Sequence, residues 1–223
     1  MQERYNIISK FLKAALCYKR KGFSVIPCKP RSKEALIQWT EYQKRLPTEE
    51  EIRRWWTQNP EANVAIVLGK VSGLIVLEVD DPEAIKDKHI PETPQAISGG
   101  KGLPHIFFRY PKQEMKNYKN QENGRELFSI RGDGQYVVVA PSIHPTGNIY
   151  KWAYGLGIHQ TELAEPPDWV LKLIFDNPAK EEAERYYKQK DNKYNDSLRQ
   201  YIKELKSMIQ LSDLLIHFRD KQN

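Results

Sequence analysis

Long apolar runs and cysteines are both scarce in this chain. No stretch approaches the ~18 consecutive apolar residues of a transmembrane helix, and residues 1–21 carry charges throughout, unlike a secretion signal. We therefore expect a cytoplasmic protein with no membrane partner. The two cysteines, Cys17 and Cys28, form no CxxC pair and have no histidines at matching spacing, so neither a structural zinc site nor a disulfide framework is expected.

Apolar residues are also few, at 39% of the 223 residues, but the 11% of aromatic residues argue against a disordered chain. The net charge of +6 fits a polyanionic partner. A chain of this length can hold one large domain, or a domain of about 175 residues with an appendage.

Apolar periodicity and turn residues predict a domain that mixes helices with strands. Helices are expected over 4–21, 48–59 and 168–175, and strands over 23–28, 63–69, 74–80, 105–110, 126–131 and 135–140. The strands over 63–69 and 74–80 look like an antiparallel pair, and Gly132-Asp133-Gly134 predicts a tight turn. Of the adjacent Trp55 and Trp56, which point about 100° apart on a helix, we expect one to lie in the core, while stacking on single-stranded bases is the alternative.

A change in composition marks a boundary near Asn177-Pro178. Residues 178–206 are mostly polar, and apolar positions between Ile209 and Phe218 predict a final helix. We therefore divide the chain into a domain over 1–177 and a helical C-terminal extension over 178–223.

Two carboxylates end the apolar strand that reads LIVLEVD. Strand alternation places Glu78 and Asp80 on one face, about 7 Å apart at their Cα atoms. Buried carboxylates need a partner or a cation, so this pair is a candidate site for divalent metal ions. The alternative is that the strand emerges into solvent and that Asp81-Pro82 caps a short helix.

A glycine-rich loop, SGGKGLPH, follows about twenty residues later. Ser98, Gly99, Gly100, Lys101 and Gly102 have the composition of a phosphate cradle, because glycine lets backbone amides approach an anion and lysine adds positive charge. The loop does not fit GxxxxGK[ST] and precedes a strand, which excludes a P-loop. A plain flexible loop is the alternative.

His105 and Arg131 are two further candidates for contact with phosphate. His105 enters a strand directly from the glycine loop and could donate to a phosphate or a leaving oxygen, or it could be structural. Arg131 lies beside the predicted turn and suits bidentate phosphate recognition, while a solvated arginine on a surface hairpin is the alternative.

In order and spacing these segments resemble the bifunctional primase-polymerase (Prim-Pol) branch of the archaeo-eukaryotic primase superfamily. Five blocks carry the resemblance, which spans residues 5–176: GFSVIPCKPRSKEALIQW, NVAIVLGKVSGLIVLEVD, ISGGKGLPHIFF, IRGDGQYVVVAPSIHPTGNIYKW and PPDWVL. The resemblance implies an α+β fold, a two-module catalytic core with central, mostly antiparallel sheets flanked by helices.

The resemblance also implies an enzyme, a metal-dependent nucleotidyltransferase that acts as DNA primase and DNA polymerase. Glu78 and Asp80 match the acidic pair that holds two divalent ions, Mg²⁺ or Mn²⁺, with Glu78 where aspartate is usual. The loop matches the family's nucleotide-binding loop, in which serine and histidine contact the phosphates. The expected catalytic residues are Glu78, Asp80 and His105, and the expected nucleotide-binding residues are Ser98, Gly99, Gly100, Lys101, Gly102, His105 and Arg131.

The partners implied are a single-stranded DNA template, dNTPs or NTPs, and a helicase or C-terminal helicase-like module. The setting implied is replication of a mobile element, a phage or a defence system. Lys29, Arg31 and Lys33 are candidate contacts to the template, with a solvated loop as their alternative role.

The third metal ligand is where the sequence departs from the family. Ser129 stands where an acidic residue is usual, and a serine hydroxyl is a poor, neutral ligand for magnesium. Either Glu126 or Asp133 replaces it through a local shift, or the third ligand is missing, or the register differs. Alternation places Glu126 on the opposite face unless the strand has a bulge.

A second function remains open because of Ser129. The chain would then be a catalytically degenerate module that binds single-stranded nucleic acid. A metal-dependent nuclease ranks lower, since it leaves the glycine loop without a role.

Overall fold

The structure, a computed structural model, describes residues 9–175 of the chain. Over this range the chain forms three α-helices, two short 3₁₀ helices and nine strands. The helices are α1 (Lys10–Arg20), η1 (Thr40–Gln43), α2 (Glu49–Gln58), η2 (Pro82–Ile85) and α3 (Asp168–Phe175). The strands are β1 (Ser24–Cys28), β2 (Asn63–Val67), β3 (Leu74–Val79), β4 (Gln95–Ile97), β5 (Pro104–Arg109), β6 (Tyr118–Glu122), β7 (Arg125–Arg131), β8 (Tyr136–Val138) and β9 (Lys151–Trp152). The predicted α+β class is confirmed.

The strands form two sheets in which each pair of neighbours is antiparallel. The first sheet has the order β1-β2-β8, and the second has the order β6-β7-β3-β5-β4-β9. Pro27 lies in β1, at the edge of the first sheet, where a missing backbone N–H does not interrupt a ladder on both sides.

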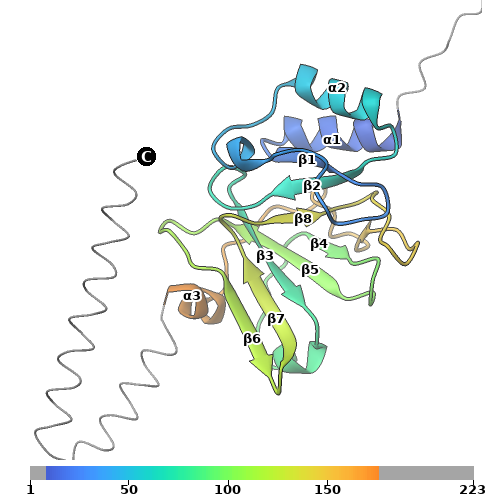
Figure 1. The fold of residues 1–223 in the computed structure, drawn as a ribbon. Coiled ribbons are helices and arrows are strands. Elements are labelled where there is room, and N and C mark those ends of the chain that lie inside the picture. The colour runs from blue at the N-terminus through green and yellow to red at the C-terminus, as the bar shows by residue number, and fades with distance from the viewer. Residues whose placement is uncertain (1–8, 176–223) are drawn as a thin grey trace, which may run out of the picture. The chain divides into compact units, whose positions relative to one another are not determined.

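The elements are arranged in layers, as Figure 1 shows, with α1 and α2 on the outer face of the first sheet. One hydrophobic cluster joins these helices, the first sheet and one face of the second sheet, where Val76 and Phe107 lie. A second cluster covers the opposite face of the second sheet, where Ile75 and Phe108 pack with Val170 of α3. The second sheet is therefore buried on both faces.

Local signals explain where the helices begin and end. Thr48 forms a capping box with Glu51, in which the Thr48 side chain accepts from the Glu51 amide (3.2 Å) and the Glu51 carboxylate accepts from the Thr48 amide (2.8 Å). Helix α1 ends before Gly22, which has a φ of 88°. Trp55 and Trp56 are both buried, so both belong to the core and neither is a stacking platform for bases.

The expected antiparallel pair over 63–69 and 74–80 is wrong. Strand β2 pairs with β1 and β8 in the first sheet, whereas β3 pairs with β5 and β7 in the second. Only an isolated bridge between Gly69 and Leu74 joins the two segments. The physical reason is that both edges of each strand are already occupied, so the turn passes the chain from one sheet to the other.

The turn at Gly132-Asp133-Gly134 also leads the chain from one sheet to the other. It connects β7 of the second sheet to β8 of the first, so the two strands it joins do not pair as a hairpin. The connections from β2 to β3 and from β7 to β8 therefore both link the first sheet to the second.

Some predictions fall beyond the described residues. The helix expected over 4–21 begins at Lys10 instead, because Ser9 is its non-helical N-cap, and residues 4–8 lie outside the described range. The boundary near Asn177-Pro178 and the helix between Ile209 and Phe218 also lie outside it and stay predictions. Among residues 9–175, no helix combines the length and apolar character needed to cross a membrane.

Candidate active site

Three neighbouring strands of the second sheet bring polar side chains to one face. Glu78 of β3 pairs with His105 of β5 on one side and with Ser129 of β7 on the other. Directly paired residues of antiparallel strands lie on the same face of the sheet. Arg131, two residues beyond Ser129, shares this face, which is the one that turns toward the first sheet.

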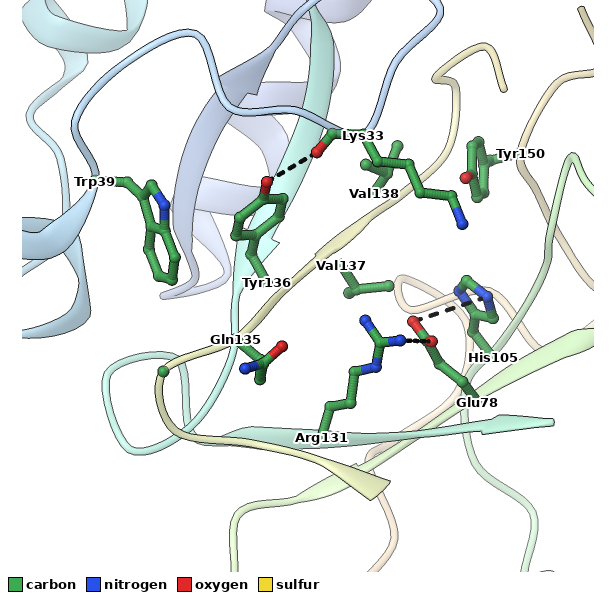
Figure 2. A pocket seen from close by; sticks show the side chains of 11 residues that line it. Lys33, Trp39, Glu78, His105, Arg131, Gln135, Tyr136, Val137, Val138 and Tyr150 are labelled. Atoms are coloured by element: carbon green, nitrogen blue, oxygen red, sulfur yellow. Dashed lines mark hydrogen bonds and ion pairs between the residues drawn. The ribbon is translucent and has the colours of Figure 1, made fainter. Parts of the chain in front are cut away.

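A cavity of about 300 Å³ lies between the two sheets at this position. Figure 2 shows Glu78, His105 and Arg131 on one wall of the cavity, with Lys33 reaching in from a loop beside the first sheet. The cavity is lined by Lys33, Trp39, Glu78, His105, Arg131, Gly134, Gln135, Tyr136, Val137, Val138 and Tyr150. It therefore combines two cationic side chains, one carboxylate and several aromatic rings.

Glu78 is mostly buried and forms an ion pair with Arg131. Its Oε2 lies 2.8 Å from Nη2 of Arg131, and its side chain is 14% exposed. Burial raises the pKa of the Glu78 carboxyl, while Arg131 and Lys33 oppose this shift. The Glu78 carboxylate thus depends on positive charge beside it, which Arg131 supplies within the protein.

His105 is neutral in this environment. Burial lowers its pKa to about 3, and the nearby charges of Lys33 and Arg131 add to the effect. Its Nε2 lies 4.0 Å from Oε1 of Glu78, too far for a hydrogen bond, and its Nδ1 has no partner. His105 therefore has hydrogen-bonding capacity that the protein itself does not use.

Asp80 and Asp81 take different roles at the end of β3. The Asp80 carboxylate is 35% exposed and lies 3.1 Å from Nζ of Lys101. Asp81 caps η2, since its Oδ1 accepts from the Glu83 amide at 3.1 Å, and it also pairs with Arg125 at 3.2 Å. The helix-cap alternative from the sequence thus describes Asp81, while Asp80 remains directed to the glycine loop.

The glycine loop packs closely against the segment over 144–148. Ser98 accepts from the Gly100 amide at 3.2 Å, and Thr146 donates to the carbonyl of Gly99 at 2.9 Å. Lys101 reaches Asp80, as described above. The structure thus places the loop next to the acidic pair, although Ser98, Gly99, Gly100, Lys101 and Gly102 do not line the cavity itself.

Alanine substitutions should separate two glycines of this loop. A Cβ atom at Gly99 would lie 2.8 Å from the carbonyl oxygen of Asn148 and 2.5 Å from Cβ of His144, so we expect Gly99→Ala to cost about 1–3 kcal/mol. Gly102 has open space but a φ of 71°, so Gly102→Ala should cost roughly 1 kcal/mol. Urea denaturation of both variants tests the order, and an equal or smaller cost at Gly99 would contradict this packing.

The residues considered for the third metal ligand differ in their environment. Ser129 is buried, 1% exposed, and its hydroxyl lies 3.4 Å from Nε of Arg131. Asp133 serves the turn, because its carboxylate accepts from the Lys70 amide at 3.0 Å and from the hydroxyl of Tyr110. The Asp133 carboxylate is therefore already hydrogen-bonded within the protein, where it stabilises the turn between β7 and β8.

A bulge changes the position of Glu126. The pairing of β6 with β7 skips Leu127, and the amides of Asp80 and Asp81 both donate to the Leu127 carbonyl, at 2.9 and 2.8 Å. A bulge interrupts alternation, so Glu126 is not confined to the opposite face. Its charge contributes to the raised pKa of Glu78. Glu126 is thus the acidic side chain that the strand geometry brings toward the site.

The charge of Glu126 is itself countered by a lysine. Its Oε2 lies 3.0 Å from Nζ of Lys119. Burial favours a higher pKa for Glu126, but the hydrogen bonds from Lys119 and Ser129 outweigh it and lower the pKa. Within residues 9–175, no three histidine, cysteine, aspartate or glutamate side chains are grouped as a metal site.

Sequence reasoning missed several side chains that line the cavity. Tyr150, Trp39 and Tyr136 were not among the predicted site residues, and Lys33 was expected at most as a template contact in a loop. Lys29, from the same loop, is instead half-exposed and pairs with Glu34 at 2.7 Å. The available signal was the presence of these residues within the blocks that carry the family resemblance, but their convergence is produced by the tertiary structure.

Comparison with known proteins assigns most of the chain to one family. No curated protein matches the chain. One family model does match, over residues 14–169, and it is described as "Bifunctional DNA primase/polymerase, N-terminal". The matched range includes both sheets and the residues of the cavity. The chain therefore belongs to the family of N-terminal bifunctional DNA primase/polymerase domains, for which DNA primase or polymerase activity is the general expectation.

Proposed function

We propose that the cavity binds a nucleoside triphosphate and that the chain is a template-directed DNA primase and polymerase, a metal-dependent nucleotidyltransferase. One observation supports this most directly. A cavity between the sheets joins Glu78, His105 and Arg131, three residues that the sequence assigned to metal and nucleotide binding. From the family resemblance we infer that the activity serves replication of a mobile element, a phage or a defence system.

The cavity offers complementary groups for each part of a nucleotide. Lys33 and Arg131 supply positive charge for the phosphates. Trp39 and Tyr136 form an edge-to-face pair with ring centroids 5.0 Å apart, and aromatic faces of this kind suit stacking by a base. The volume of about 300 Å³ is at the lower end of the range for ligand pockets.

Glu78 and Asp80 fit a site for Mg²⁺ or Mn²⁺ by their donor chemistry. Such ions take oxygen ligands, keep several waters and are often held by one or two carboxylates together with substrate phosphates. Both carboxylates already attract positive charge, from Arg131 at 2.8 Å and Lys101 at 3.1 Å. Glu126 is the candidate for a third carboxylate. When bound, two ions would activate the 3′-hydroxyl and neutralise the triphosphate.

The protein's own side chains mainly position the reactants. Arg131 and Lys33 orient the phosphates, and neutral His105 offers an N–H that can donate to a phosphate or leaving oxygen. Because the cavity lies between two sheets, the bound phosphates would be partly shielded from water. This strengthens each charge-assisted hydrogen bond relative to one on an open surface.

The direct test is incorporation of dNTPs or NTPs by the wild-type protein on single-stranded templates, with and without a primer. We expect products whose sequence follows the template and which require Mg²⁺ or Mn²⁺, so that EDTA abolishes them. A chain that folds but gives no product across both metals, several templates and both nucleotide types would overturn this proposal.

The degenerate binding module remains the second candidate, and Ser129 supports it. A neutral hydroxyl occupies the strand position beside Glu78 where the family usually has an acid. This function requires binding of single-stranded DNA with a steep salt dependence and a nucleotide affinity that manganese does not change. Nucleotide titrations with and without manganese separate the two candidates, since the polymerase requires a metal-dependent affinity.

A further inference from the structure

Two buried side-chain atoms of the described residues lack any hydrogen-bond partner, and both belong to residues that line the cavity. They are the hydroxyl of Tyr150 and Nδ1 of His105. Buried polar groups are almost always hydrogen-bonded, because an unpaired group has lost its bonds to water without replacement. Their occurrence in the same cavity indicates a polar ligand that bonds to both.

The other buried tyrosines of the described residues satisfy their hydroxyls within the protein. The Tyr18 hydroxyl donates to the Ala140 carbonyl at 2.6 Å and accepts from Trp152 at 3.1 Å. The Tyr42 hydroxyl donates to Glu51 at 3.0 Å. Tyr150 is only 1% exposed, less than either of them. Its unpaired hydroxyl is therefore an exception that packing alone does not explain.

The side chains around Tyr150 indicate the charge of the ligand that its hydroxyl would bind. Figure 2 shows Tyr150, His105 and the ammonium group of Lys33 at one end of the cavity, away from Trp39 and Tyr136. Burial raises the pKa of Tyr150, so its hydroxyl keeps its proton and can donate. The ammonium group of Lys33 also donates, and the unpaired Nδ1 of His105 donates when it carries the ring proton, so this end of the cavity suits an anionic oxygen.

We propose that Tyr150 is a phosphate-binding residue whose hydroxyl donates to the phosphate chain of the bound nucleotide, beside His105. The ring centroids of the two residues lie 6.3 Å apart, close enough for both to reach oxygens of one phosphate chain. The identification of the ligand as a nucleotide rests on the proposed function. Recognition of phosphate does not depend on the polymerase reaction and can be measured without it.

Calorimetric titration of inorganic tripolyphosphate, dATP and adenosine into the wild-type protein and a Tyr150→Phe variant tests this role. We expect the variant to bind tripolyphosphate and dATP roughly tenfold more weakly, because a hydrogen bond to a charged group is lost, and to bind adenosine as before. The matched control is Tyr154→Phe, since Tyr154 is fully exposed and does not line the cavity.

Thermal unfolding separates this role from a structural one. The hydroxyl that Tyr150→Phe removes has no partner in the protein, so the unfolding midpoint should not fall. A lower midpoint with unchanged affinity, an equal loss for adenosine, or a wild-type protein that does not bind tripolyphosphate would each overturn the inference. If tripolyphosphate binding depends on Tyr150 but no template-directed product forms, the inference stands and the proposed polymerase function fails.

Discussion

Replacing Asp80 with asparagine is expected to reduce metal-dependent nucleotide incorporation by roughly a thousandfold, because under the proposed function a neutral amide would replace an anionic metal ligand. The fold should be retained. Asp80 is 35% exposed, and within residues 9–175 its side chain pairs only with the exposed Lys101, at 3.1 Å, a surface ion pair of the kind worth about 0–1 kcal/mol. Primer extension measures the loss, and thermal unfolding checks that the variant is folded.

The neighbouring Asp81 provides a matched control for this substitution. Asparagine at position 81 can still cap η2, as the carboxylate does by accepting from the Glu83 amide. Asp81→Asn should therefore keep nearly full incorporation. Full activity in Asp80→Asn, or an equal loss in both variants, would show that the acidic end of β3 does not act through Asp80.

The positions of the three α-helices and of six strands followed from local residue patterns, whereas β4, β6 and β9 were not predicted. The Thr48 capping box and the apolar spacing of Ile52, Trp55 and Trp56 predict α2 without reference to the rest of the chain. The division of strands between two sheets could not be predicted in this way. The turn at Lys70–Gly73 requires a reversal of direction, but it does not determine whether β2 and β3 pair with each other or with different neighbours.

Some residues of the candidate site could likewise be predicted from the sequence, and others could not. Glu78, His105 and Arg131 were predicted because they stand in recognisable blocks, and the pairing of β3 with β5 and β7 places them together. Lys33 and Tyr150 come from loop regions, where no periodicity indicates a direction. Their approach to the cavity depends on how the first sheet and the segment after Pro141 pack on the second sheet, which is a tertiary property.

The position of Glu126 shows a further limit of sequence reasoning. Strict alternation places it on the face opposite Ser129, and this would exclude it from the site. The bulge at Leu127 removes that restriction, but nothing in the residues RELFSIR announces a bulge. A single inserted residue therefore determines which carboxylate can approach Glu78, and only the paired strands reveal it.

The largest expected loss of stability comes from Phe107, in the centre of the second sheet. Phe107 is fully buried in β5, pairs with Val76 across the sheet and packs against Trp152 with ring centroids 5.2 Å apart. Phe107→Ala should cost about 3–5 kcal/mol through lost contacts and the cavity that remains. For a domain of this size the unfolding midpoint should fall by roughly 10 °C.

The same substitution tests the layered architecture, because Phe107 belongs to the cluster that joins the second sheet to the first. Tyr154→Ala is the control, since it also removes an aromatic ring but from a fully exposed position, and it should change the free energy of unfolding by no more than about 0.5 kcal/mol. If Phe107→Ala does not fold, Phe107→Leu should still unfold at a lower temperature than the wild type, because leucine fills only part of the space. Equal stability of Phe107→Ala and Tyr154→Ala would mean that the two sheets are not held together at this face.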